Sequence, residues 1–445
     1  MNRFLAVVAT WLMVLVALAQ GGPGGPGGGG QPTLSLVGSF TNWTGNSPAT
    51  NRFLFPAQLP STEGFTHPVV YTKGGSAQLQ VFFQNNNPQQ DFVGNLIVQD
   101  ARFIHSTPPA AGTPGSPPPV TIPDTILSAP TVSLSVPIGQ TSPASLSLGG
   151  LPSFVTHGYI QLTMRVEGNF GAQTPGGNPS PWSGIVPTQK VYITLSNPVG
   201  VMNPVWTELA EMSCSFAQLE ANPTDVNRQL TRGLFSGRVF KYNLPAGTSV
   251  YADIPAGGTG PNAMGYNLKL LLTNRYGAAA GGGVVFGGCA DINGFLCLLH
   301  LAQGIDSSAR IVYGIYLEGE DKFLTNPFVP IGYDASNSAH YIRVRFAWHL
   351  QVQVSGLISD AAMAYLQDLN GQEWKKPAFA WAYEGSWQTF NAPEMYGLAY
   401  RQYLDLVDYN GNMDPPYDFP VWFAGPSPAK LENKAFETYT ITVVF

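Results

Sequence analysis

One cysteine stands where a predicted helix begins, directly after two glycines. In CADINGFLCLLHLAQG, from Cys289 to Gly304, apolar residues recur every three or four positions, and Gly304 suits the positive φ that ends many helices. A thiol at a helix N-terminus lies beside unpaired backbone N–H groups and the positive end of the helix dipole, both of which favour the nucleophilic thiolate. The same N–H groups can hold the oxyanion of an acyl group under attack. Cys289 is therefore the candidate nucleophile, with its own backbone N–H as part of an oxyanion hole.

A thiolate nucleophile needs a histidine to carry a proton and a carboxylate to orient that histidine. Two strands that end at Val354 and begin at Leu357 are expected to form a hairpin. With these two residues paired, Asp360 opposes Gln351 on the same sheet face as His349, within reach of its imidazole. A three-residue loop would turn Asp360 away. The sequence predicts His349 as the general base and then acid, and Asp360 as the orienting carboxylate.

The other histidines are weaker candidates. His340 lies an odd number of residues before His349, so in a continuous strand it would face the other side of the sheet. His67, His105 and His157 have no cysteine or carboxylate at a useful spacing, and a structural role is expected for them.

Three blocks of sequence contain the candidate residues and the turn between them. They are Gly288-Cys289-Ala290-Asp291, then Gln303-Gly304-Ile305 followed by Ala309 to Gly314, and last Trp348-His349 followed by Ser359-Asp360-Ala361. Together they resemble the core pattern of the transglutaminase-like, papain-like thiol superfamily, within a region from Trp206 to Pro377. The turn from Gly304 to Arg310 is longer than the family's usual one, and no side-chain oxyanion donor can be assigned upstream of the cysteine.

The resemblance implies both a fold and a chemistry. It implies a papain-like domain in which Cys289, at a helix end, faces a sheet that carries His349 and Asp360. It also implies an acyl-thioester intermediate that is passed to water or to an amine, with a peptide or protein amide as the substrate. Bacterial members of the family are often hydrolases rather than crosslinking enzymes, and both hydrolysis and acyl transfer stay open here.

The three cysteines of the chain leave alternatives open. Cys214 and Cys297 could form a disulfide or be buried thiols, since each lies inside a predicted helix among apolar neighbours. A disulfide at Cys289 would abolish the thiol chemistry. No CxxC or HxxxH spacing favours zinc, and no cofactor or metal ion is expected.

Two further segments resemble functional ones. DYNGNMDPPYD, from Asp408 to Asp418, is similar to a calcium loop, but Met413 stands where an EF-hand needs glycine and Phe419 where it needs glutamate. A looped turn is therefore expected. Aromatic residues crowd the run from Trp374 to Tyr400, where they could line a substrate cleft or pack in a core.

Composition favours a strand-rich, exported protein. Charged residues are 11% of the 445-residue chain, with 50 glycines, 38 prolines and a formal net charge of -6. No basic run supports a nucleic-acid partner. Residues 1–19 combine Arg3, an apolar stretch too short to span a bilayer comfortably and an AxA pattern, so a cleaved signal peptide is expected, with a retained anchor as the alternative. We expect a periplasmic, cell-surface or extracellular location, with no stable membrane insertion after cleavage.

The rest of the chain divides into three regions. The Gly/Pro-rich residues 20–32 are expected to form a flexible linker. Residues 33–198 contain seven segments of alternating apolar residues, which are typical of an immunoglobulin-like β-sandwich. From residue 199 to 445 helices alternate with strands, which predicts an α+β domain. Thr224 is the expected N-cap of one helix, and Thr438 to Phe445 the last strand.

Two functions of different classes fit these observations. The first is an exported thiol enzyme in which the β-sandwich positions a transglutaminase-like domain that hydrolyses peptide or amide bonds or transfers their acyl groups. The second is a catalytically inert surface or envelope interaction protein that uses the same fold as a scaffold. Its sandwich would bind a partner that the sequence does not identify. An active triad predicts selective alkylation of Cys289, whereas equally slow reaction of all thiols predicts the scaffold.

Overall fold

The computed structural model describes residues 34–41, 69–106, 122–171, 182–186, 190–202, 205–236, 239–243, 249–253, 263–276, 283–313, 323–324, 328–333, 343–346, 348–365, 421–422 and 437–443. The expected signal peptide and linker, His67, His340, the aromatic run and the looped turn lie outside these residues. Within the described ranges, no helix is both long and apolar enough to cross a membrane.

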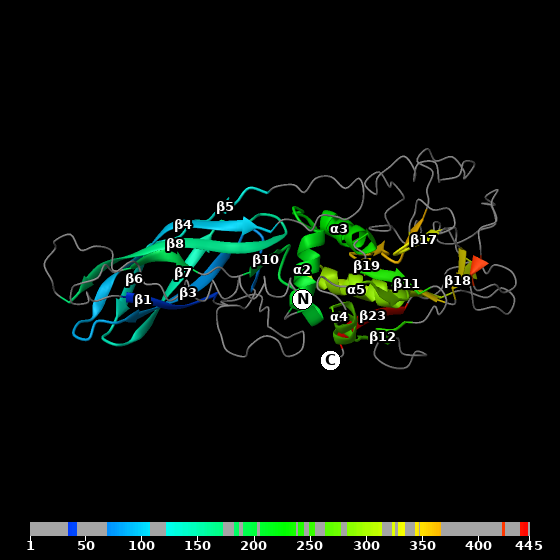
Figure 1. Cartoon of the computed structure of the whole chain (residues 1–445). Helices are drawn as coiled ribbons and strands as arrows, with labels where there is room; N and C mark the ends of the chain where they lie inside the picture. The colour runs from blue at the N-terminus through cyan, green and yellow to red at the C-terminus, as the bar shows by residue number, and fades with distance from the viewer. Residues whose placement is uncertain are drawn as a thin grey trace, which may run out of the picture.

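The first part of the described chain forms two sheets in which most neighbouring strands are antiparallel, drawn in blue to green in Figure 1. The first sheet has the order β1 (Leu34–Thr41), β3 (Ser76–Asn85), β7 (Thr141–Gly149). The second has the order β2 (Val69–Thr72), β10 (Lys190–Thr194), β8 (Thr156–Phe170), β4 (Phe92–His105), β5 (Thr125–Ile126), with β6 (Val132–Val136) on β4 and β9 (Trp182–Val186) on β8. The seven segments expected to be strands all lie in these sheets.

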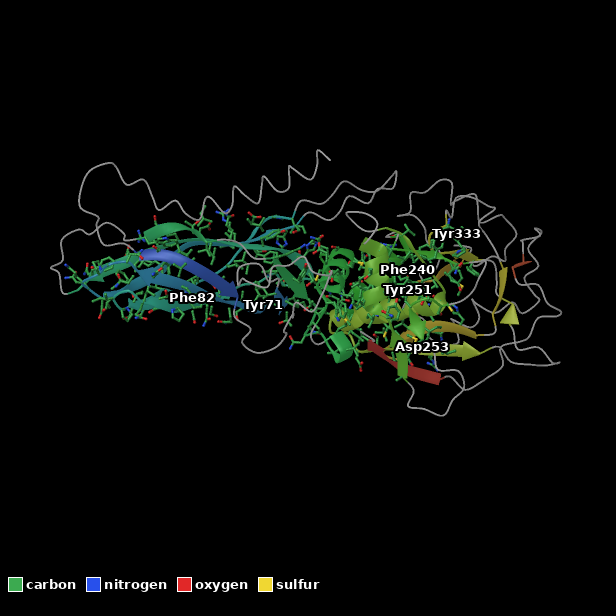
Figure 2. All side chains as sticks on the ribbon, turned by 60° about the horizontal axis from the view of Figure 1, so that its bottom comes forward. Tyr71, Phe82, Phe240, Tyr251, Asp253 and Tyr333 are labelled. Carbon is green, nitrogen blue, oxygen red and sulfur yellow. The ribbon has the colours of Figure 1, made fainter. Side chains whose placement is uncertain are left out.

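Alternation along the strands buries one face of each sheet in a shared core. Along β3 every second side chain is buried, as period-two spacing requires when only one face is covered. The core contains Val81, Phe83 and Leu146 from the first sheet, and Phe103, Leu162 and Met164 from the second. The two sheets are therefore a sandwich. Figure 2 places Tyr71 at the end of this sandwich nearer the helices and Phe82 farther along it.

The second part of the described chain mixes helices and strands, as expected. Its helices are η1 (Gly200–Met202), α2 (Thr207–Phe216), α3 (Pro223–Ser236), α4 (Leu268–Tyr276) and α5 (Cys289–Ala302). Its main sheet has the order β12 (Ala252–Asp253), β13 (Ala263–Tyr266), β23 (Glu437–Val443), β15 (Ser307–Tyr313), β19 (Trp348–Val354), β20 (Leu357–Ser359). The shorter pairings are β11 (Phe240–Tyr242) with β14 (Val285–Gly287), β18 (Arg343–Phe346) with β16 (Phe323–Leu324) and β22 (Val421–Trp422), and β17 (Phe328–Pro330) with β21 (Met363–Tyr365).

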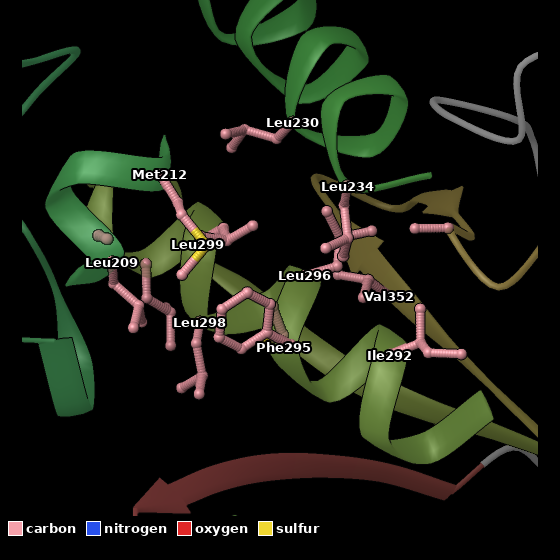
Figure 3. Packing of buried hydrophobic residues seen from close by; sticks show 14 of the residues in the cluster. Leu209, Met212, Leu230, Leu234, Ile292, Phe295, Leu296, Leu298, Leu299 and Val352 are labelled. Atoms are coloured by element: carbon pink, nitrogen blue, oxygen red, sulfur yellow. The ribbon is translucent and has the colours of Figure 1, made fainter. Parts of the chain in front are cut away.

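Helix α5 begins at Cys289 as expected, but it does not expose a polar face. Every residue from Cys289 to Ala302 is buried. Figure 3 shows why: Phe295 and its neighbours on α5 are surrounded by leucines of α2 and α3 and by Val352 of β19. A helix that is covered on all sides must be apolar or have partners for every polar group. The recurrence of apolar residues in the sequence, which is typical of a helix with one buried face, therefore predicted the helix but not its burial on all sides.

Helix α3 corrects a second expectation. The helix begins at Pro223, so Thr224 lies in its first turn and is not the N-cap. The cap is Asn222, whose Oδ1 accepts a hydrogen bond from the backbone N–H of Asp225 at 2.9 Å. Proline at the first helical position fits this arrangement because its missing N–H would have no partner there.

The end of α5 is hydrogen-bonded to the chain that leaves the sandwich. The backbone N–H of Leu195 donates to Oε1 of Gln303 at 3.1 Å, and that of Ser196 donates to the Gln303 carbonyl at 3.1 Å. Gly304 follows at φ +72, in the conformation expected for a helix C-terminus. A Cβ on Gly304 would lie 2.3 Å from Ser196 Oγ and 2.4 Å from the Asn197 carbonyl oxygen. The sandwich and α5 thus meet at a position that only glycine fits.

We predict that Gly304→Ala destabilises the protein by clearly more than the roughly 1–2 kcal/mol that a left-handed backbone costs a non-glycine residue. The excess comes from the clash with the segment after β10. Gly139 is the matched control, because it has φ +64 and open space around its Cβ position. Chemical unfolding of both variants measures the difference. Equal losses at the two positions would contradict the close contact at Gly304.

Candidate active site

Gly288 and Asp291 fix the start of α5, and with it the candidate nucleophile. The carboxylate of Asp291 accepts four backbone N–H groups: Gly288 at 2.9 Å, Val250 at 2.8 Å, and Tyr251 and Ala252 at 2.7 Å each. Burial raises the pKa of Asp291, while these four donors act in the opposite direction. Asp291 therefore connects the first turn of α5 to the chain entering β12. Because its carboxylate also accepts from Gly288, the backbone on both sides of Cys289 is fixed.

The hairpin expected to bring histidine and aspartate together is present in the expected register. Val354 pairs with Leu357 and Val352 with Ser359, around a two-residue turn in which Ser355 and Gly356 both have positive φ. Asp360 follows directly after the last paired residue.

In this register the imidazole and the carboxylate meet. Nε2 of His349 lies 2.7 Å from Oδ2 of Asp360, and both side chains are shut off from solvent. The predicted contact between His349 and Asp360 is therefore confirmed.

The thiol of Cys289 is the third group of this cluster. It is close enough to His349 to raise the pKa of the imidazole, after the larger effect of Asp360, and since Nε2 faces Asp360, Nδ1 is the ring nitrogen that could serve the sulfur. Cys289 is 5% exposed, His349 0% and Asp360 1%. Helix α5 supplies the sulfur, β19 the imidazole and the segment after β20 the carboxylate. The structure thus brings together all three residues that the sequence singled out.

The charge state of His349 follows from its neighbours. Burial alone lowers the pKa of His349, but the carboxylate of Asp360 and then the sulfur of Cys289 outweigh it and raise the pKa to about 10. The imidazole is therefore protonated at neutral pH, and it lies between a carboxylate and a sulfur that can share its charge.

A residue that sequence reasoning missed lies close to Cys289. Tyr242 is on β11, and the parallel pairing of β11 with β14 sets it opposite Gly287, two residues before Cys289. Cys289 acts on the pKa of its hydroxyl, so the phenol lies in the neighbourhood of the thiol. Burial, followed by the charges of Cys289 and Asp360, raises the pKa of Tyr242 well above its usual value. The phenol therefore keeps its proton and can donate it in a hydrogen bond.

Asn293 is the second residue that sequence reasoning missed. It lies one helical turn after Cys289 and is fully buried. Its Nδ2 donates to Oδ1 of Asp360 at 2.8 Å and to the carbonyl of Leu350 at 2.6 Å, and its Oδ1 accepts from the N–H of Ala361 at 2.9 Å. A polar residue at this spacing in an otherwise apolar helix was the signal available in the sequence.

The remaining cysteines and histidines of the described chain have structural partners. Cys214 and Cys297 are free buried thiols rather than a disulfide, and burial raises the pKa of each to about 12. Cys289 is also free. His105 contacts threonine hydroxyls and His157 a serine hydroxyl, at 3.1 Å in each case. Among the residues that the structure describes, no group of His, Cys, Asp and Glu could hold a metal ion.

Comparisons with known proteins find only distant likenesses. The chain matches no family model and no curated protein. Its structure is similar to that of red sea bream transglutaminase, with 12% identity, 71% of this chain and 54% of that chain covered, and a TM-score of 0.31. It is also similar to PapD-like domain 7 of human CEP192, with 10% identity, 29% and 80% covered, and a TM-score of 0.18. The chain thus spans about half the length of the transglutaminase, and at such TM-scores neither likeness bears on function.

We predict that Asp360→Asn lowers the pKa of His349 from about 10, because the carboxylate is the largest cause that raises it and burial then dominates. Ring signals of labelled histidines, followed by NMR through a pH titration, measure the shift. His300 is an internal control, since burial lowers its pKa to about 3 and it has no carboxylate partner to lose. An unchanged His349 titration would contradict the pairing.

The same titration has a consequence for stability. The pKa of His349 in the folded protein lies above the ordinary histidine value, so its protonation stabilises the fold fully below that ordinary value. This contribution is lost as the pH rises through about 10, and it is smaller in Asp360→Asn. Unfolding midpoints measured across the alkaline range test the direction.

Proposed function

We propose that this protein is a thiol enzyme that transfers the acyl group of a peptide or amide to water or to an amine. One observation carries the proposal: Cys289, buried at the N-terminus of a helix, is close enough to His349 to raise the pKa of its imidazole, and Nε2 of His349 is hydrogen-bonded to Asp360 at 2.7 Å. A sulfur, an imidazole and a carboxylate in this order are the parts that nucleophilic thiol catalysis needs.

The first half of the reaction needs Cys289 as a thiolate and His349 as an imidazolium. The thiolate of Cys289 attacks the carbonyl carbon and forms the carbon–sulfur bond, while charge develops on the carbonyl oxygen. The N–H of Cys289 and the hydroxyl of Tyr242, whose pKa Cys289 raises, would donate to that oxyanion. The imidazolium of His349 gives its Nδ1 proton to the leaving nitrogen as the carbon–nitrogen bond breaks.

The second half returns the site to its starting state. His349, now neutral, takes a proton from water or an amine, whose oxygen or nitrogen attacks the thioester carbon. The carbon–sulfur bond breaks and regenerates the thiolate beside an imidazolium. Asp360 keeps the ring oriented through both halves and balances its positive charge. The acceptor decides between hydrolysis and acyl transfer.

The proposal extends to the domain organisation, the export and the substrate of the protein. We propose a two-domain protein, with the sandwich at residues 33–198 and the transglutaminase-like domain at 199–445, on the sequence pattern and the two separate cores. Export is proposed from the signal-peptide pattern of residues 1–19. The substrate would be a peptide or protein.

We predict that iodoacetamide alkylates Cys289 before the other two thiols, and that His349→Ala slows this reaction by roughly tenfold or more, because the cation beside the sulfur is lost. Cys214 and Cys297 are the internal references, since both are fully buried with their pKa raised to about 12. Mass spectrometry of peptides after timed labelling assigns each rate. Equal, slow labelling of all three thiols would favour the inert scaffold instead.

We predict that Tyr242→Phe slows acylation of Cys289 by p-nitrophenyl acetate roughly 10²- to 10³-fold, the usual loss when one oxyanion-hole donor is removed. Release of p-nitrophenol measures this step without a known natural substrate. Alkylation by iodoacetamide forms no oxyanion, so its rate at Cys289 serves as the control and should change little. Equal slowing of both reactions would mean that Tyr242 acts on the thiolate rather than on the oxyanion.

A further inference from the structure

Asn293 contacts both β19 and the segment after β20, which supply the imidazole and the carboxylate of the proposed site. One Nδ2 hydrogen goes to Oδ1 of Asp360 and the other to the carbonyl of Leu350, the residue after His349. Its own Oδ1 accepts from the N–H of Ala361, the residue after Asp360. Both hydrogens and the oxygen of this buried amide are therefore used, and none is directed at solvent.

The contact with Asp360 also limits how its carboxylate can turn. Oδ1 of Asp360 accepts from Asn293 and, at 2.9 Å, from the N–H of Ala362. With Oδ1 engaged twice, Oδ2 is the oxygen directed at Nε2 of His349. Rotation of the carboxylate would break three hydrogen bonds of a group that is buried away from the solvent.

Asn293 lies on the helix that carries the nucleophile. Positions four apart share one face of a helix, so Cys289 and Asn293 lie one above the other on α5. The sulfur is thus fixed to the imidazole and the carboxylate through a single rigid element. The hairpin alone brings His349 and Asp360 together, but it does not fix them relative to α5.

We propose that Asn293 is a positioning residue of the acyl-transfer site, which holds Asp360 against His349 and fixes the β19–β20 hairpin to the helix of the thiol. This inference rests on the proposed function for its effect on rate. Its effect on the His349–Asp360 pair does not depend on any activity. The side chain of Asn293 is hydrogen-bonded to Asp360, Leu350 and Ala361, so its influence passes through Asp360.

The test uses the full chain with Asn293→Leu, which keeps the branched shape with a somewhat larger side chain, and Asn293→Ala, which leaves a space. Both variants remove the hydrogen bond that holds the Asp360 carboxylate against His349. Because the carboxylate can then turn away from Nε2, the titration midpoint of His349 should fall from about 10 in both. Both should also slow acylation by p-nitrophenyl acetate roughly 10- to 100-fold, the size of effect seen when an outer partner of a site is removed. Agreement between the two variants separates the lost hydrogen bond from altered packing.

Asn227→Leu is the matched control. Asn227 is a buried asparagine on α3 whose Oδ1 accepts from Ser359 Oγ at 3.0 Å and from His300 Nε2 at 2.8 Å, so it holds the residue next to Asp360 without contacting Asp360 itself. This variant should lose stability, yet it should keep the His349 titration and the acylation rate within about twofold of wild type.

Two results would overturn the inference: an unchanged His349 titration in both Asn293 variants, or an equal shift in Asn227→Leu. A wild-type protein that is not acylated at Cys289 would instead refute the proposed function. The NMR titration would still decide whether Asn293 positions the pair, so the two failures are distinguishable.

Discussion

The buried pair of His349 and Asp360 constrains the rest of this site. A buried carboxylate is stable only when its oxygens are hydrogen-bonded and a positive charge lies close to it. Asp360 meets both requirements, with the imidazole of His349 on one oxygen and two N–H donors on the other. Such an arrangement tolerates little displacement, because a lost partner leaves an uncompensated charge. The elements around it must therefore be fixed to one another.

Helix α5 fulfils this role through its polar side chains rather than through its apolar ones. A wholly apolar helix that is buried on all sides could shift or rotate at a small cost in free energy. Directional hydrogen bonds, in contrast, specify one position. Three polar side chains of α5 and one just after its end are hydrogen-bonded to four different neighbours. Asp291 binds the chain entering β12, Asn293 the β19–β20 hairpin, His300 the α3 residue Asn227, and Gln303 the segment after β10. Through the last contact the sandwich is connected to the helix of the candidate nucleophile.

The sequence predicted what depends on near neighbours along the chain. The hairpin register could be predicted because the turn length fixes the pairing of every residue that follows, including the place of Asp360. Gly304 was predictable from helix-end chemistry. Tyr242 was not, because its place depends on the parallel pairing of β11 with β14, two segments distant in sequence that share no local pattern. Asn293 had a visible spacing but no visible partner, and the burial of α5 on every side depends on α2, α3 and the sheet.

Two fully buried histidines show that burial alone does not decide charge in this protein. His300 donates to the amide oxygen of Asn227, and burial lowers its pKa to about 3, so it is neutral at any ordinary pH. In His349 the same burial is outweighed by a carboxylate and a sulfur, and the pKa rises to about 10. An amide partner satisfies a hydrogen bond without offering charge, whereas a carboxylate offers both. The chemical type of the partner thus separates a structural histidine from one that can hold and return a proton, and only His349 also faces a thiol.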